Sequence, residues 1–293
     1  DANGCKTTKT FVITNPNTPT LSITASSSSI CVGQTATLTP SGAVSYTLSS
    51  PSTVFASNVS VSPVSTTVYN VSGTDASNCI SALTSVTINV NALPLVTAVP
   101  STTAICSGST ATLTAGGATT YTWTSGPTAV TYSVNTAGVY TVTGTDLNNC
   151  VNTKTVSLTV NSNPSLATTA GGLLNVSCLG TSTGSLSTTA SGTSGYSYVW
   201  NPAVSSTNTA TGLNAGVYTT TVTDVNGCKA VLSNTISAPS TSLATAVVTS
   251  TTGCGLSNGT ATLTPTGGWS SSYSYQWQSS ASTLATATGY SAG

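Results

Sequence analysis

The chain of 293 residues carries four Lys and four Asp, has a net charge of zero, and contains no His, Glu, Arg or Met. It lacks the basic surface that attracts nucleic acids or anionic membranes, and no apolar run is long enough to span a bilayer. Without His or Glu, no Ser has an ordinary catalytic base. We therefore expect no enzyme, no cofactor and no metal.

β-Branched and aromatic residues mark the regular segments, whereas strong helix formers are nearly absent. This balance favours strands. Short strands with frequent turns, grouped in units of about 75 residues, are typical of immunoglobulin-like domains. The predicted fold class is all-β: a tandem array of immunoglobulin-like β-sandwich repeats that forms a rod.

Two sets of cysteines follow the repeat. In each full copy of one motif, such as the copy that begins at Val139-Tyr140, a Tyr lies six residues before an Asp and the Asp lies four residues before a Cys. A second set lies near the start of each repeat. The late cysteines are Cys5, Cys79, Cys150 and Cys228, and the early cysteines are Cys31, Cys106, Cys178 and Cys254.

The repeats follow one another through short linkers, each marked by one Pro. Residues 1–16 are the tail of a preceding repeat, with a turn at Asp1 and a final strand over 6–13. The other boundaries are 17–92 and 93–162 for two immunoglobulin-like repeats, 163–238 for a third repeat, and 239–293 for a truncated fourth repeat. Alternating residues predict strands at 35–39, 44–48, 67–72, 84–90 and 121–123.

The fourth repeat stops where repeats two and three continue into their Val-Tyr strands. Its segment Tyr273–Trp277 matches Tyr196–Trp200 of repeat three, but its last two strands are missing. A sandwich without these strands has a raw edge. The simplest interpretation is a segment of a longer array. The alternative is donor-strand assembly, in which residues 6–14 of one chain complete the fourth repeat of the next.

Each Asp is expected to shape a hairpin turn. A carboxylate entering a tight turn accepts hydrogen bonds from backbone N–H groups two residues on, and Asn or Gly closes the turn. Calcium is the functional alternative, but one carboxylate per repeat falls short of the ligands that a calcium site needs. The turn-forming residues are Asp1, Asp75, Asp146 and Asp224.

Aromatic residues recur at two positions of the repeat. A Tyr near the start of the sixth strand commonly bonds back to the backbone, and a large third-strand residue fills the core of a sandwich. The expected core anchors are Tyr69, Tyr140, Tyr218, Trp123, Trp200 and Trp277, with Leu48 in the Trp position of repeat one. A carbohydrate platform is the alternative for these Trp residues. Trp269 follows two glycines in an expected loop and is the better candidate for a surface contact.

Eight regularly spaced cysteines in a weakly charged β chain indicate disulfides and an extracellular setting, whereas zinc would need close pairs such as C-x-x-C. The early and late cysteines of one sandwich lie at opposite ends, about 20 Å apart, but a disulfide needs Cα atoms within about 7 Å. In a head-to-tail array, the early end of one repeat faces the late end of the next. We therefore favour Cys31–Cys150 and Cys106–Cys228, with partners outside this sequence for the other cysteines. Bonds within repeats and bonds between chains are the alternatives.

Together these motifs resemble the tandem immunoglobulin-like and SprB-type repeats of giant surface adhesins of gliding bacteria, which are exported by type IX secretion. Repeats one and two share C-x-G-x-x-A-T-L-T and V-Y-x-V-x-G-T-D-x-x-x-C with the immunoglobulin-like kind. Repeats three and four share Tyr-x-Tyr-x-Trp with the SprB kind, and repeat three also shares 212–218 and 223–228. The resemblance implies a secreted or surface-attached protein with a role in adhesion, gliding or filaments, and it carries over no catalytic residue.

The low charge predicts how copies associate. Surfaces of soluble domains normally carry about 25–35% charged residues, whereas only 3% of this chain is charged. Neighbouring chains would therefore meet without like-charge repulsion, and we expect a structural stalk whose copies bundle laterally into a fibre. The alternatives are glycan cover on the Ser and Thr residues, and a module whose loop aromatics bind a glycan or host surface.

Overall fold

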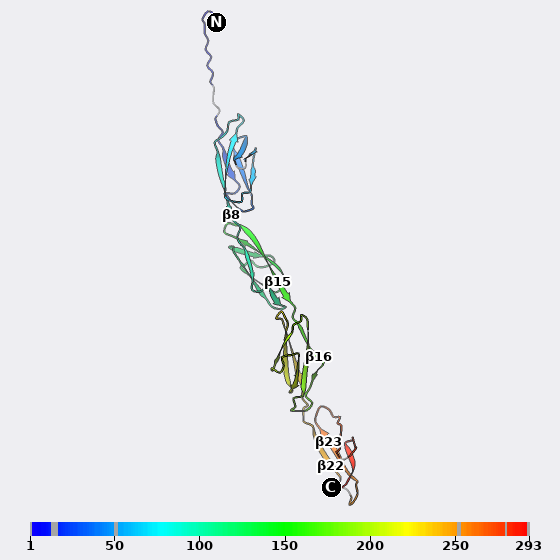
Figure 1. The fold of residues 1–293 in the computed structure, drawn as a ribbon. Helices are drawn as coiled ribbons and strands as arrows, with labels where there is room; N and C mark the ends of the chain where they lie inside the picture. Colours follow the sequence, from blue (N-terminus) through cyan, green and yellow to red (C-terminus); the bar gives the residue numbers. More distant parts are fainter. Residues whose placement is uncertain (1, 13–16, 50–51, 251–252, 279, 292–293) are drawn as a thin grey trace. The chain divides into compact units, whose positions relative to one another are not determined.

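In a computed structural model of the protein, the described residues are 2–12, 17–49, 52–250, 253–278 and 280–291. Every regular element in this part of the chain is a strand (Figure 1), which confirms the predicted all-β class. No helix of these residues is long and apolar enough to cross a membrane. The chain divides into two compact units, 1–103 with 110–158 and 104–109 with 159–293.

The first sandwich lies in the first unit and has two sheets. One sheet has the order β1-β3-β6, and the other has the order β2-β8-β7-β4-β5, with β2 parallel to β8. The strands are β1 (Ser22–Ala25), β2 (Ser29–Cys31), β3 (Ala36–Ser41), β4 (Ser45–Ser49), β5 (Ser52–Phe55), β6 (Val59–Val61), β7 (Thr67–Thr74) and β8 (Thr84–Asn91). Alternate residues of both sheets, among them Leu38, Val71 and Ile88, are fully buried in one core. This is the layout of an immunoglobulin-like sandwich.

The next strands repeat the plan. They are β9 (Thr97–Pro100), β10 (Ala104–Cys106), β11 (Ala111–Gly116), β12 (Thr120–Trp123), β13 (Thr131–Val134), β14 (Gly138–Thr145) and β15 (Val151–Asn161). They form sheets of order β13-β11-β9 and β10-β15-β14-β12. Leu113, Trp123 and Val142 are fully buried in the first unit, whereas β10 pairs in parallel with residues 159–161 of β15 in the second unit.

The third sandwich lies in the second unit. Its strands are β16 (Ser165–Leu174), β17 (Gly184–Ser191), β18 (Ser197–Asn201), β19 (Thr209–Leu213), β20 (Gly216–Thr223) and β21 (Lys229–Ile236). Two three-stranded sheets, β16-β17-β19 and β18-β20-β21, enclose a core that contains Leu186, Trp200 and Ile236.

The fourth repeat forms one sheet of order β22-β23-β24, made of β22 (Ala244–Thr249), β23 (Gly259–Thr266) and β24 (Thr286–Tyr290). Every residue of β22 is exposed. Within the described chain, residues 273–276 belong to no strand ladder, although they match the third strands β4, β12 and β18 of the other repeats. The strand that would pair with them, the counterpart of β7, β14 and β20, has no equivalent in this repeat among the described residues.

The strands expected at 35–39, 44–48, 67–72, 84–90 and 121–123 are found within about two residues of those limits. The prediction of a strand over 6–13 is wrong for the residues that the structure describes. Residues 6–12 are not in a strand, and residue 13 lies outside the described residues. The physical reason is that a strand needs a neighbour for its backbone hydrogen bonds, and the described chain offers none to this segment.

Candidate functional site: cysteine-linked Asp turns

The turn at 146–150 shows how the sequence fixes a late cysteine. Oδ1 of Asp146 accepts hydrogen bonds from the backbone N–H groups of Asn148 and Cys150, both at 2.8 Å. The N–H of Asp146 donates to the carbonyl of Cys150 at 3.0 Å, and Asn149 adopts a φ of 61°. One carboxylate thus satisfies two backbone donors and holds the cysteine at the start of the next strand.

The same contacts recur in two other turns. Oδ1 of Asp75 accepts from the N–H groups of Ser77 and Cys79 at 2.8 and 2.9 Å. Oδ1 of Asp224 accepts from Asn226 and Cys228, both at 2.9 Å. Asp224 is the most buried of the three, and its Oδ2 has no hydrogen-bond partner in the described chain. Asp1, the fourth expected turn residue, lies outside the described residues.

No group of three or more His, Cys, Asp or Glu side chains that could hold a metal lies together in the described part of the chain. The four lysines, Lys6, Lys9, Lys154 and Lys229, are exposed.

Two disulfides connect early and late cysteines of successive repeats. Cys31 is bonded to Cys150 in the first unit, and Cys106 is bonded to Cys228 in the second; the Cα atoms are 5.5 Å apart in both bonds. Cys150 and Cys228 are fully buried. These are the two pairs that the end-to-end geometry favoured over bonds within one repeat.

The strand order places the first bond across a linker. β2 runs parallel to β8, with Cys31 opposite Asn91, so the early cysteine lies where the chain leaves the first sandwich. On the other side, the Asn152 side chain donates to the carbonyl of Pro94 at 2.9 Å, which keeps the start of β15 beside the linker. The Cys31–Cys150 bond therefore spans the linker 91–94, with Cys31 beside its first residue and Cys150 near its last.

The second bond has the same setting in the second unit. Cys106 of β10 lies opposite Asn161, and the N–H of Ser107 donates to the Asn161 carbonyl at 2.8 Å. The side chain of Asn163 in turn donates to the carbonyl of Ser107 at 3.2 Å. Cys228, the partner of Cys106, follows the Asp turn that connects β20 to β21.

The four bonded cysteines interleave along the chain in the order Cys31, Cys106, Cys150, Cys228. The two closed loops, with sequence separations of 119 and 122, therefore overlap over residues 106–150. Neither loop can be pulled open without breaking a covalent bond.

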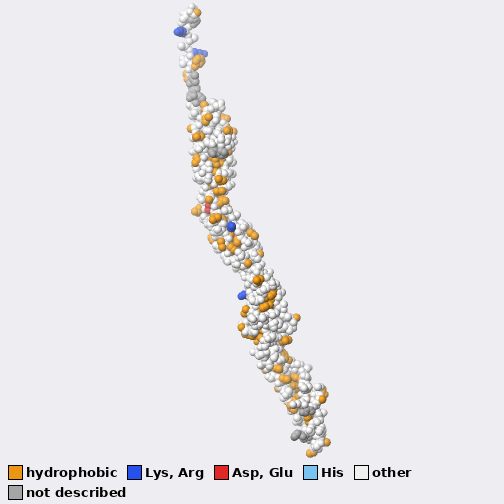
Figure 2. Space-filling model, in the orientation of Figure 1, with side chains coloured by type: hydrophobic (Ala, Val, Ile, Leu, Met, Phe, Trp, Pro, Cys, Tyr) orange, Lys and Arg blue, Asp and Glu red, His pale blue; other side chains and the backbone are white. Residues whose placement is uncertain are grey.

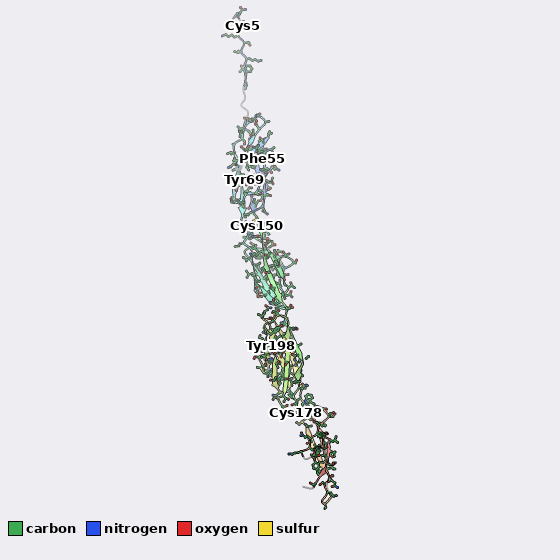
Figure 3. The ribbon with its side chains drawn as sticks, turned by 45° about the vertical axis from the view of Figure 1, so that its right-hand side comes forward. Cys5, Phe55, Tyr69, Cys150, Cys178 and Tyr198 are labelled. Atoms are coloured by element: carbon green, nitrogen blue, oxygen red, sulfur yellow. A yellow bond between two sulfur atoms is a disulfide. The ribbon has the colours of Figure 1, made fainter. Side chains whose placement is uncertain are left out.

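The expected tyrosine anchors behave in two ways. The hydroxyl groups of Tyr140 and Tyr218 donate to the carbonyls of Thr136 and Asn214, at 2.7 and 3.1 Å, four residues upstream in both cases. Tyr69 is buried in the core of the first sandwich, against which Phe55 also packs; both residues are labelled in Figure 3. Burial raises the pKa of the Tyr69 phenol above its ordinary value.

Burial also raises the pKa of the Tyr198 phenol, and the neighbouring Tyr196 adds to this shift.

The third-strand tryptophans share one contact. The indole N–H groups donate to backbone carbonyls six or seven residues downstream: Trp123 to Ala129 at 3.2 Å, Trp200 to Thr207 at 2.8 Å and Trp277 to Leu284 at 2.9 Å. Trp123 and Trp200 are buried, and Leu48 is buried in the corresponding position of the first sandwich. Trp277 is only half-buried, because the fourth repeat has one sheet in the described chain.

Trp269, the expected surface residue, is 51% exposed. Its indole N–H donates to the carbonyl of Val176 in the third sandwich at 2.7 Å. The ring also lines a pocket with Cys178 and Tyr273 in the second unit. The sequence gives no signal for this contact, because its partners lie 93 positions apart and neither belongs to a repeated motif.

Cys79, Cys178 and Cys254 form no disulfide in the described part of the chain. Cys79 is half-buried, whereas Cys5, Cys178 and Cys254 are exposed.

No protein-family model matches the sequence. No curated protein matches it either. The chain is similar to solved structures of immunoglobulin domains, at low identity. One is the first eight immunoglobulin domains of the Down syndrome cell adhesion molecule: identity is 11%, the match covers 85% of this chain and 40% of that chain, and the TM-score is 0.37.

A structure of three immunoglobulin domains of titin matches at 12% identity over 75% of this chain and 98% of that chain, with a TM-score of 0.35. A 1.5-MDa bacterial ice-binding adhesin matches at 14% identity over 76% of this chain and 98% of that chain, with a TM-score of 0.30. The chain thus spans less than half of the eight-domain structure of the cell adhesion molecule. Similarity at this level supports no conclusion about function. The structural class, a tandem array of immunoglobulin-like sandwiches with disulfide-linked neighbours, rests instead on the strand order of the sheets.

Proposed function

We propose that this chain is a load-bearing stalk or filament segment of an extracellular bacterial surface adhesin. The observation that carries the proposal is the interleaving of the Cys31–Cys150 and Cys106–Cys228 bonds. The boundaries 17–92, 93–162, 163–238 and 239–293 define its repeats. Disulfides of this kind persist in oxidising, extracellular settings, and the sequence motifs suggest export by type IX secretion and a role in attachment or gliding.

Interleaved bonds change the path that tension follows. Tension applied to the two ends of the chain is transmitted from Cys31 to Cys150 through the first bond. It then follows the backbone from residue 150 back to residue 106 and crosses the second bond from Cys106 to Cys228. Only about 44 residues lie on this path, so it extends to about 150 Å at ~3.5 Å per residue. Without the bonds, the roughly 200 residues from Cys31 to Cys228 would extend to about 700 Å. The bonds therefore keep most of three repeats from being stretched out.

Single-molecule stretching tests the proposal. The chain is held by its ends and unfolded with and without a reductant. Reduction is expected to add about 550 Å of contour length, and a variant with all four bonded cysteines replaced by Ser should behave like the reduced chain. Equal contour length in both conditions would refute a load-bearing role for the bonds.

We also propose that copies of the chain bundle laterally. Three of its four Asp lie in the turns described above, where their carboxylates accept backbone hydrogen bonds. Figure 2 shows few charged side chains on the face drawn and only small, scattered apolar groups. Neighbouring chains would therefore meet uncharged sheet faces without like-charge repulsion. Sedimentation over a range of concentrations tests this, and a strictly monomeric chain at high concentration would rule bundling out.

The second candidate function is a module that binds a glycan or a host surface through Trp269. Its half-exposed ring beside a pocket favours this function. However, its indole N–H is already bonded to Val176, and among the described residues the other large exposed aromatic side chain is Phe11. Glycan-array binding that is lost in Trp269→Ala would support the module. No binding in the unaltered chain would favour the stalk.

A further inference from the structure

We propose that the surface around Cys178 is a docking site for a β-hairpin with an Asp-x-Asn-x-Cys turn, which becomes covalently linked to Cys178. The inference concerns a binding site and does not depend on whether the chain bears load. It is carried by three features of the second unit: the local structure at Cys178, the pocket beside it, and an unpaired segment nearby.

Cys178 is followed by the same turn as the two early cysteines that are already bonded, although Cys31 and Cys106 end strands and Cys178 does not. The carbonyls of Cys31, Cys106 and Cys178 each accept the N–H of the residue three positions on, at 3.0, 2.9 and 3.2 Å. In all three, a Gly two residues after the Cys has a positive φ, between 77° and 87°. Cys31 and Cys106 are disulfide-bonded to the cysteines of Asp turns, whereas the thiol of Cys178 forms no disulfide in the described chain and is exposed.

A pocket of about 250 Å³ lies beside this thiol. It is lined chiefly by Cys178, Leu179, Pro239, Leu243, Trp269 and Tyr273. Two hydrogen bonds hold its walls: the Trp269 indole N–H to Val176 at 2.7 Å, and the Tyr273 hydroxyl to the Gly267 carbonyl at 3.0 Å. Figure 3 labels Cys178 at this boundary between the third sandwich and the fourth repeat.

Tyr273 indicates what fits there. Its hydroxyl donates to a backbone carbonyl six residues upstream, and the hydroxyls of Tyr46 and Tyr121 likewise donate to upstream carbonyls, three residues away, at 2.9 and 2.7 Å. Those tyrosines lie in β4 and β12, and both strands pair with the strand that leads directly into an Asp turn.

In the fourth repeat, residues 273–276 pair with no strand of the described chain. Backbone groups that no strand of the described chain pairs with can accept an added strand, the mode of binding known as β-augmentation.

The site therefore fits a hairpin of the form that this chain builds at Gly216–Ile236, where β20, the Asp224 turn and β21 follow one another. The first strand of such a hairpin would pair with 273–277, and its turn cysteine would meet Cys178. With a small-molecule disulfide as oxidant, the link forms by exchange. The Cys178 thiolate attacks the hairpin sulfur of a mixed disulfide, a new S–S bond replaces the old one, and the small thiolate leaves and takes up the proton that Cys178 lost.

A synthetic peptide with the sequence of residues 216–236 tests this site. Its single cysteine is activated as a mixed disulfide with glutathione, and it is added to the intact chain. Mass spectrometry then measures the rate of capture at each thiol. Capture at Cys178 is expected to be at least roughly tenfold faster than at Cys254, which is also exposed. A matched peptide with Asp224→Ala should lose this preference.

Hydrogen exchange gives an independent readout. The peptide with Cys228→Ser, which cannot form a bond, should still slow exchange at residues 273–277 of the unaltered chain. Equal capture at Cys178 and Cys254, or an unchanged preference with the Asp224→Ala peptide, would overturn the proposal. Rapid formation of Cys178–Cys178 dimers in preference to capture would also overturn it and indicate a second copy as the occupant.

Discussion

Removal of the Cys31–Cys150 bond should lower the stability of the first unit by a calculable amount. The bond closes a loop with a sequence separation of 119, for which chain-entropy arithmetic gives about 5 kcal/mol at 25 °C. The first unit has about 150 residues, and in domains of that size 1 kcal/mol shifts the unfolding midpoint by roughly 2–4 °C. The double variant Cys31→Ser/Cys150→Ser should therefore unfold about 10–20 °C below the unaltered chain.

Differential scanning calorimetry of the oxidised chain measures this shift. Cys254→Ser is the matched control, because Cys254 is exposed and forms no disulfide in the described chain, so its midpoint should stay within about 1 °C. The Cys106–Cys228 bond is intact in both variants, and the transition of the second unit should be unchanged. An unchanged midpoint for the first unit in the double variant would refute the entropy argument.

Three further predictions concern the turns and the cores. Asp146→Ala removes two charge-assisted hydrogen bonds and should lower the free energy of unfolding by about 2 kcal/mol, whereas Asp146→Asn keeps an acceptor and should cost less; urea unfolding measures both. Trp123→Ala empties a buried site and should cost about 3–5 kcal/mol, with half-buried Trp277→Ala as the milder comparison. The third prediction is a loss of stability at high pH. Because the folded-state pKa of Tyr69 is raised above 10.0, its contribution is complete below that pH and is lost as the pH rises through the folded-state pKa. Tyr69→Phe should flatten this decline in urea titrations, and an unaltered slope would count against it.

Local chemistry made the turns and the bonds predictable from the sequence. An Asp four residues before a Cys has few other ways to satisfy the backbone donors between them, so the contacts of Asp75, Asp146 and Asp224 follow from spacing. The disulfides follow from topology, because the ends of a sandwich are too far apart for one bond.

Features that depend on a distant partner were not predictable. Residues 6–12 and 273–276 have strand-forming sequences, yet neither is in a strand, because strand propensity acts only where another strand supplies hydrogen bonds. The contact of Trp269 with Val176 likewise joins residues from two different repeats. Repetition in a sequence defines the repeats, but it carries less information about the contacts between them.

Disulfide mapping by mass spectrometry of the unreduced protein shows directly whether the bonds connect successive repeats. We expect linked peptides that join Cys31 to Cys150 and Cys106 to Cys228. Peptides that join Cys31 to Cys79 and Cys106 to Cys150 would instead confine each bond to one repeat. The loops would then no longer interleave, and the proposed load path would be wrong.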